Sequence, residues 1–243
     1  MKNNNKFRLD VWGAITLGTI ALYALFLLYP MAYLIRQSVL DPDTGGFTLA
    51  YFTKFFSKSY YFETLINSFK VSITATVLSI AIGTPLAYLF TIFKIKGKSV
   101  LNILIVVASM SAPFIGAYSW ILLLGRSGVI TTFFKNLGIT IPDIYGFGGI
   151  VLVMTLQLFP LVFLYAKGAL KNIDNSLIEA AENLGCSGIA CFFKVVVPLI
   201  MPTLLAAALL VFMRSFADFG TPMLIGEGYR TFPVVLYTEF INE

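Results

Sequence analysis

Apolar residues gather into five long runs along this chain, and polar residues mark the connections between the runs. The runs cover about 11–35, 64–93, 100–124, 148–170 and 196–217. A membrane-spanning α-helix needs about 20 mostly apolar residues, so each run is long enough to cross a bilayer. The first run is also too long for the apolar core of a cleaved signal sequence. The pattern predicts an all-α, polytopic transmembrane helical bundle with five spans in this chain.

Basic residues indicate which way the bundle faces. They are concentrated at the N-terminus and in two connections, where the sequence has Lys2, Lys6, Arg8, Lys94, Lys96, Lys98, Lys167, Lys171 and Lys194. With five spans, these three segments lie on one side of the membrane, and the positive-inside rule makes that side the cytoplasm. The connections on the other side, 36–63, 125–147 and 218–243, carry charges of both signs. We therefore expect a cytoplasmic N-terminus.

The composition favours a membrane protein and excludes several other classes. Charged residues are 12% of the chain and hydrophobic residues 58%, whereas soluble domains are about 25% charged. The net charge of +5 does not indicate nucleic-acid binding, because the basic residues form no single patch. The chain has no histidine, the commonest general base and metal ligand. Cys186 and Cys191 have no other ligands nearby in the sequence, so we predict no metal site and no bound cofactor.

Prolines interrupt three successive runs. They are Pro85, which follows Gly83 and Thr84, then Pro113 and Pro160. A proline inside a membrane helix frees a backbone carbonyl that neighbouring helices or a cavity must satisfy. The prolines are therefore either packing kinks or bends around a shared cavity.

The connection between the fourth and fifth runs has the pattern of a helix–turn–helix. Ser176 and Glu179 have the spacing of a capping box, which predicts a helix start. Gly185 can adopt a positive φ and end that helix. A second short helix, about 187–196, would then lead to Pro198 and the fifth span. This segment is expected to lie on the cytoplasmic surface. The simplest interpretation is a surface hairpin in which Glu179 only caps its own helix.

The same segment carries a specific spacing of charged, small and apolar residues. They are Glu179-Ala180-Ala181, Gly185, Val195, Val197 and Pro198. This pattern resembles the signature loop of importer permeases of the ATP-binding-cassette type. That family usually has Ile and Leu where this chain has Val195 and Val197, a departure that keeps the apolar character.

The resemblance implies that this segment is a coupling helix. In the family, the loop inserts into a groove on a cytoplasmic ATPase dimer, which binds ATP and Mg²⁺ and moves the membrane helices by closing. The residues to which the resemblance assigns this role are Glu179, Ala180, Ala181 and Gly185, with Pro198 framing the loop. It also implies a bacterial cell membrane location, an extracytoplasmic solute-binding protein and a second permease half. No ATPase activity is expected of this chain, because its Gly97-Lys98-Ser99 lacks the first glycine of a phosphate-binding loop.

Other stretches are similar to one branch of that family, the ferric-iron permeases. They are residues 111–125, 216–222 and 232–237. In that branch two homologous halves are fused, and this sequence is similar to the first half without its last helix. We expect 1–62 to hold the cytoplasmic N-terminus, the first membrane helix and an extracytoplasmic loop, and 63–243 to be the permease core.

The transported solute stays open at this point. Polyamine, thiamine, phosphonate, sulfate and molybdate relatives share much of the pattern, so ferric iron is the first expectation among several. A membrane enzyme is a rival class, but the chain has no histidine and no clustered carboxylates within its spans. An inert membrane scaffold is the remaining rival.

Arg214 and Asp218 are ionisable residues near the outer end of the fifth span. Such residues are costly in lipid and usually face a bundle interior or a cavity. Their spacing of four places both on one helical face. They are candidates for a pathway or gate, and the alternative is that both reach the lipid headgroups.

Overall fold

The structure is a computed structural model that describes residues 11–41, 44–93, 96–110, 112–186 and 188–242. Within these ranges the regular secondary structure is helical, apart from one isolated β-bridge between Leu40 and Phe47. This agrees with the all-α prediction. The chain divides into two compact units, Met1–Phe62 and Glu63–Glu243, each of which is described separately below.

The first unit contains one long apolar helix and one short helix. The long helix runs from α1 (Val11–Tyr23) through a π-helical turn, η1 (Ala24–Leu28), into α2 (Tyr29–Val39), and α3 (Ala50–Ser57) follows. Pro30 explains the π turn, because it has no N–H to continue the α-helical pattern. The N–H of Tyr29 instead donates to the carbonyl of Ala24, five residues back. Most side chains along Val11–Val39 are exposed and none is buried, as expected of a helix surrounded by lipid or by partner helices.

The second unit holds the remaining helices. They are α4 (Ser59–Ile92, which begins in the first unit), α5 (Lys98–Ser109), α6 (Pro113–Leu124), α7 (Val129–Asn136), α8 (Phe147–Lys171), α9 (Asn175–Asn183), α10 (Gly188–Cys191), the π-helical η2 (Phe192–Val196), α11 (Val197–Phe216), α12 (Gly220–Ile225) and α13 (Phe232–Asn242).

Five helical segments in the described residues are long and apolar enough to cross a membrane. They are Val11–Val39, Ser59–Ile92, Pro113–Asn136, Phe147–Lys171 and Gly188–Phe216. The predicted number is confirmed.

The predicted third span, 100–124, is not one helix. It is split between α5 and α6, and the candidate span begins at Pro113 instead. The reason is local. The residue before a proline is disfavoured in the helical region, and Ala112 is extended, with φ −67° and ψ 141°.

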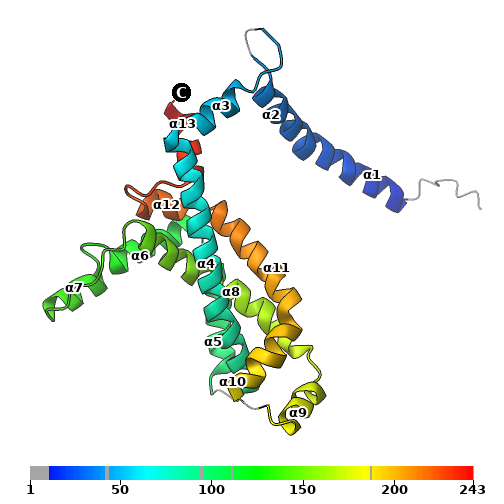
Figure 1. The fold of residues 1–243 in the computed structure, drawn as a ribbon, viewed down its shortest axis with the longest axis vertical. Helices are drawn as coiled ribbons and strands as arrows, with labels where there is room; N and C mark the ends of the chain where they lie inside the picture. The colour runs from blue at the N-terminus through cyan, green and yellow to red at the C-terminus, as the bar shows by residue number, and fades with distance from the viewer. Residues whose placement is uncertain (1–10, 42–43, 94–95, 111, 187, 243) are drawn as a thin grey trace, which may run out of the picture. The chain divides into compact units, whose positions relative to one another are not determined.

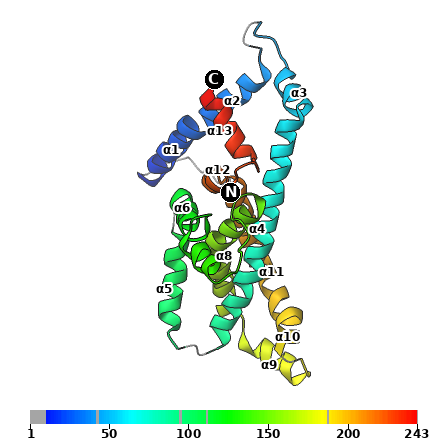
Figure 2. The same ribbon diagram turned by 90° about the vertical axis from the view of Figure 1, so that its left-hand side faces the viewer.

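Three long helices, α4, α8 and α11, form the core of this unit and lie side by side in both views (Figures 1 and 2). Phe90 on α4 packs edge-on against Phe163 on α8, with ring centroids 5.2 Å apart. Val196 and Ile200, near the start of α11, are buried in the same cluster. The face of α4 toward the core is made mainly of Ser, Thr, Ala and Gly. Small residues of this kind let membrane helices approach closely.

A second core cluster lies nearer the N-terminal end of α4 and joins it to α6, the first turns of α8, and α12. Val71, Ala117, Ile150 and Ile225 are buried in it. This cluster fixes α12 beside α6 and α8, and so sets the position of the segment that follows the fifth span.

Candidate functional site

The segment predicted to be a helix–turn–helix begins at Asp174. The side chain of Asp174 accepts a hydrogen bond from the backbone N–H of Ser176 at 3.0 Å, and α9 begins at Asn175. Asp174 is therefore the N-cap, and Ser176 lies inside the helix. The predicted capping box of Ser176 with Glu179 is wrong. The hydrogen bonds from Ser176 also lower the pKa of the Asp174 carboxyl.

Gly185 ends α9 as predicted. Its φ is +85°, a conformation that costs glycine little and other residues more. The N–H of Cys186 donates to the carbonyl of Ala181 at 3.0 Å, across this residue. A bond of that span around a left-handed glycine is the Schellman motif, which satisfies carbonyls at a helix end.

The helix after the turn differs from the prediction. The sequence indicated a separate short helix over about 187–196, but α10, η2 and α11 form one continuous helix from Gly188 to Phe216. Pro198 lies in the first turn of α11. The missing proline N–H is accommodated by the π turn, in which the N–H of Val197 donates to the carbonyl of Phe192. The turn at Gly185 is thus connected to the fifth span without a break.

The helix–turn–helix exposes apolar side chains. Leu184 is 88% exposed and Ile189 78% exposed, and Leu177 is exposed as well. Ile178, on another face of α9, packs against the core. In both views α9 and α10 lie at the opposite end of the unit from α12 and α13 (Figures 1 and 2). Exposed apolar residues gathered at one place indicate an interaction surface.

Glu179 lines a groove of about 870 Å³ beside this surface. The groove lies between the last turns of α4, the end of α8, and α9 with α10, and Tyr88, Ile178 and Phe192 form part of its wall. Ala180 is exposed and Ala181 is half-buried. Within the described residues, the Glu179 carboxylate has neither a hydrogen bond nor an ion pair. Its negative charge is therefore available to a partner.

Arg214 and Asp218 line a separate cavity of about 520 Å³. Pro113, Phe114 and Gln157 contribute to the same walls. Asp218 accepts two hydrogen bonds from Thr221, at 3.3 Å from the backbone N–H and at 2.7 Å from the hydroxyl. In the part of the chain that the structure describes, no ion pair joins Arg214 to Asp218.

The prolines do not share one cavity. Pro113 lines the cavity that Arg214 also lines, whereas Pro85 lines the groove beside Glu179. Pro160 is buried in α8.

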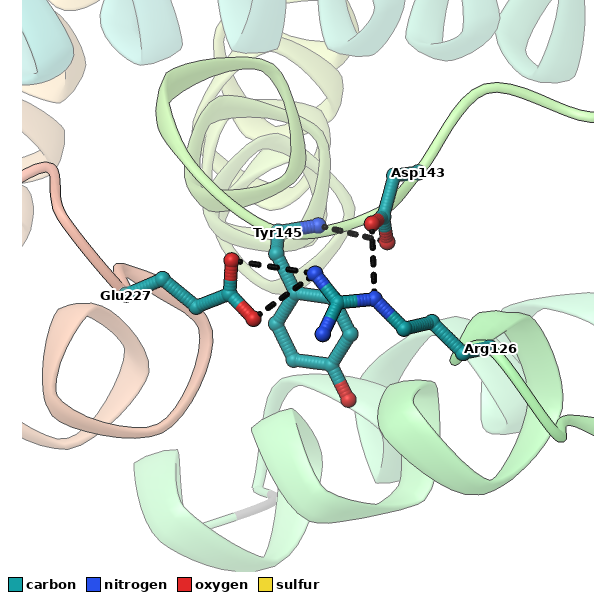
Figure 3. Close-up of polar contacts among 4 residues, drawn as sticks. All are labelled: Arg126, Asp143, Tyr145 and Glu227. Atoms are coloured by element: carbon teal, nitrogen blue, oxygen red, sulfur yellow. Dashed lines mark hydrogen bonds and ion pairs between the residues drawn. The ribbon is translucent and has the colours of Figure 1, made fainter.

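An ionic cluster that sequence reasoning missed joins three connections (Figure 3). Arg126 donates to Asp143 at 3.0 Å and lies 2.9 Å from a carboxylate oxygen of Glu227. Its guanidinium stacks on Tyr145, 4.7 Å from the ring centroid. The available signal was that these charges of opposite sign all fall in connections predicted on the same side of the membrane. Within the described residues, no three His, Cys, Asp or Glu side chains gather where they could hold a metal ion.

The five long apolar helices define a polytopic helical membrane protein, which exposes apolar side chains on its helix–turn–helix. The sequence pattern of the family described as binding-protein-dependent transport system inner membrane component matches residues 46–241. The chain belongs to this family. It is therefore a multi-pass protein of the inner membrane.

Relatives in that family are named for the transport of different solutes. The chain is 28% identical, over 90% of its length, to a putative ferric transport system permease protein FbpB of Haemophilus influenzae, and covers 34% of that relative. It is also 28% identical to the spermidine/putrescine transport system permease protein PotB of the same organism, covering 79% of it. The chain thus spans about a third of the length of the ferric relatives that it matches.

A solved structure has the same fold. It is that of a bacterial alginate ABC transporter in complex with an alginate pentasaccharide-bound periplasmic protein. Its matching chain has a TM-score of 0.78 with 16% sequence identity, over 96% of this chain and 83% of that one.

Proposed function

We propose that this chain is the permease part of an ATP-driven importer, and that its 174–198 segment docks onto cytoplasmic ATPases. The observation that carries the proposal is the exposed helix–turn–helix. Leu184 and Ile189 are apolar and unpacked, and the Glu179 carboxylate beside them has no partner in the described chain. A partner that covers the apolar side chains and offers a basic group to Glu179 would satisfy both features.

The continuous helix after Gly185 supplies a route for the coupling. Because α10 runs through η2 into α11 without a break, a displacement of α10 moves the start of the fifth span directly. A π turn is a place where a helix can deform, and η2 lies between the docking surface and the span. Closure of the ATPases would in this way shift the bundle between inward-open and outward-open states.

The proposal includes the partners that this mechanism needs. They are an ATPase dimer that holds ATP and Mg²⁺, an extracytoplasmic solute-binding protein and a second permease half, fused or separate. This chain then binds no nucleotide itself, and its N-terminus is cytoplasmic. The lysines between α4 and α5, and Lys167 and Lys171 near the end of α8, support that orientation through the positive-inside rule.

Ferric iron is the first candidate for the solute. The ferric relatives are similar to this chain over 90% and 98% of its length. Polyamines are the second candidate, since the spermidine/putrescine relatives are as similar and of more comparable length. Thiamine, phosphonate and oxyanions are further candidate solutes for the same class of transporter.

The decisive variant is Gly185→Arg. Its backbone φ of +85° disfavours any residue with a Cβ by about 1–2 kcal/mol, and a long cationic side chain would obstruct the docking surface. We expect loss of ⁵⁵Fe uptake in iron-limited cells, and loss of ATPase co-purification, with normal membrane abundance. Gly138→Arg is the matched control, because Gly138 has a φ of +77° and, like Gly185, open space around it.

Retained ATPase association in Gly185→Arg would overturn the docking role. Equal losses in Gly185→Arg and Gly138→Arg would mean that any distorted turn inactivates the protein. If the full-length gene and its variants leave iron uptake unchanged, iron is excluded, and [¹⁴C]spermidine uptake becomes the next assay. A chain that associates with no ATPase and carries neither solute would be an inert scaffold.

A further inference from the structure

The cavity lined by Arg214 is richer in hydrogen-bond donors than in free acceptors. The guanidinium of Arg214 carries a permanent positive charge and five donors, and the described residues offer it no ion pair. Gln157 also lines the cavity, and its side-chain NH₂ group is buried without a hydrogen bond in the described chain. A buried donor without an acceptor is costly, so the cavity favours a ligand that brings acceptors.

Asp218 does not cancel this preference. Both of its carboxylate oxygens accept hydrogen bonds from Thr221. Burial raises the pKa of the Asp218 carboxyl above its ordinary value, although the hydrogen bonds from Thr221 act in the opposite direction. The Asp218 carboxylate is thus bonded to the first turn of α12. Arg214, in the last turn of α11, lines the cavity without an ion pair in the described residues.

We propose that the Arg214 cavity admits the cargo through an anionic oxygen group, such as a carboxylate or an inorganic oxyanion. This proposal rests on the proposed permease function and narrows its solute. An arginine binds carboxylates and phosphates through two parallel hydrogen bonds, and Gln157 can add a third donor. Iron would therefore cross as a complex with an oxygen-rich anion.

The same arrangement disfavours free polyamines. A polyamine carries only cationic donors near neutral pH, so it would meet Arg214 as a like charge and would leave Gln157 without an acceptor. Like charges repel each other, and this repulsion opposes the binding of a polyamine beside Arg214. The cavity thus distinguishes the two solutes named for the relatives, which overall similarity does not.

The first test compares solutes in cells that carry the full-length gene with its ATPase and binding protein. Uptake of [⁵⁵Fe]ferric citrate, [³⁵S]sulfate and [¹⁴C]spermidine is measured for the wild type, Arg214→Gln and Arg214→Lys. We expect Arg214→Gln to reduce uptake of the anionic cargo about tenfold or more, the effect of losing one charge-assisted hydrogen bond. Arg214→Lys keeps the charge and should retain most of the uptake.

Lys135→Gln is the matched control, since Lys135 is an exposed cation on α7, outside the cavity. The ferric citrate and sulfate arms separate an iron chelate from a free oxyanion. Robust spermidine uptake by the wild type, or an unchanged rate of anion uptake in Arg214→Gln, would overturn the proposal.

A second test does not depend on the solute or on the ATPase. A single cysteine is placed in the cavity by Ala217→Cys, with Cys186 and Cys191 replaced by alanine. Its reaction rates with an anionic and a cationic methanethiosulfonate reagent are compared in membranes. A positively charged cleft concentrates anions about tenfold or more, so we expect the anionic reagent to be favoured and Arg214→Gln to remove the preference. If the ratio of the anionic to the cationic reaction rate is the same with and without Arg214, the cavity does not select anions. This outcome would refute the proposal even if transport and ATPase docking are confirmed.

Discussion

At the scale of single residues, Asp174 sets the start of α9 and so the position of Glu179 on the proposed docking surface. Its side chain accepts from the N–H of Ser176 at 3.0 Å, one of the donors that a helix start leaves unpaired. The sequence spacing predicted only the capping box of Ser176 and Glu179, although aspartate is also a residue type that caps helices. The sequence pattern alone does not decide whether Asp174 or Ser176 is the N-cap. That depends on which of the two residues leaves the helical backbone conformation at the start of α9. Gly185 was easier to predict, since few residues tolerate its φ.

We predict that Asp174→Ala loosens α9, whereas Asp174→Asn does not. Asparagine keeps an acceptor oxygen at the N-cap and alanine removes it. Hydrogen–deuterium exchange of the α9 amides, followed by mass spectrometry, should be faster in Asp174→Ala at neutral pH and close to wild type in Asp174→Asn. Equal exchange in all three proteins would mean that the rest of the unit holds α9 in place.

The stability of α9 should also depend on pH through Asp174. Hydrogen bonds from Ser176 lower the pKa of Asp174 below its ordinary value of 3.8. The carboxylate therefore stabilises the folded helix above the unfolded pKa, and this contribution is lost as the pH falls through the lower, folded pKa. Wild-type exchange, compared with Asp174→Asn at each pH, should rise only below about pH 4.

At the scale of elements, α4 depends on one close approach to α8. A Cβ placed on Gly83 would lie 2.9 Å from the carbonyl oxygen of Phe159 and 2.9 Å from Cβ of Val162. Both neighbours belong to the rigid part of α8, so neither can move away cheaply. The sequence marks Gly83 as a small residue in an apolar run, but only the structure identifies the neighbour that requires it.

Gly83→Ala should therefore destabilise the folded protein in detergent by about 1–3 kcal/mol, the usual cost of overpacking a core. The matched control is Gly168→Ala in α8, where an added Cβ meets nothing within 4 Å. Thermal unfolding monitored by intrinsic fluorescence compares the two variants. A fall in melting temperature shared by both would point to backbone effects of glycine replacement in place of the α4–α8 contact.

The elements themselves were largely predictable, because long apolar runs have few alternatives in a membrane. Four of the five runs are spans close to the predicted limits. The third failed at Pro113, where hydropathy continues but the backbone cannot. Hydropathy also could not reveal the π turns before Pro30 and Pro198. These turns keep each helix continuous, whereas the sequence was equally compatible with a helix break just before each proline.

At the scale of the whole molecule, the hydropathy pattern does not contain the contacts between distant connections. Arg126 and Glu227 are 101 residues apart in the sequence, yet the Arg126 guanidinium lies 2.9 Å from the nearer carboxylate oxygen of Glu227. The cavity at Arg214 likewise draws its walls from α5, α6, α8 and α11. The predicted orientation placed the ionic cluster's charges on one side of the membrane, but their pairing depends on how α12 packs against α6 and α8.

The ionic cluster leads to a prediction about Glu227, whose φ is +45°. That conformation is strained for a residue with a Cβ, and in it Glu227 forms the contact with Arg126. These side chains are about half exposed or more, and exposed ion pairs contribute little. Arg126→Gln should therefore lower the melting temperature by no more than a few degrees.

Glu227→Gly tests the strain in both backgrounds. In the wild type it removes the ion pair and the strain together, so the two effects oppose each other. In Arg126→Gln there is no ion pair left to lose, so Glu227→Gly should raise the melting temperature, because glycine adopts this φ without strain. Asp143→Asn, which removes the other partner of Arg126 but no backbone strain, is the control and should give no such rescue. A further decrease on adding Glu227→Gly to Arg126→Gln would show that the loop after α12 is held by other contacts and that the cluster does not support its strained backbone.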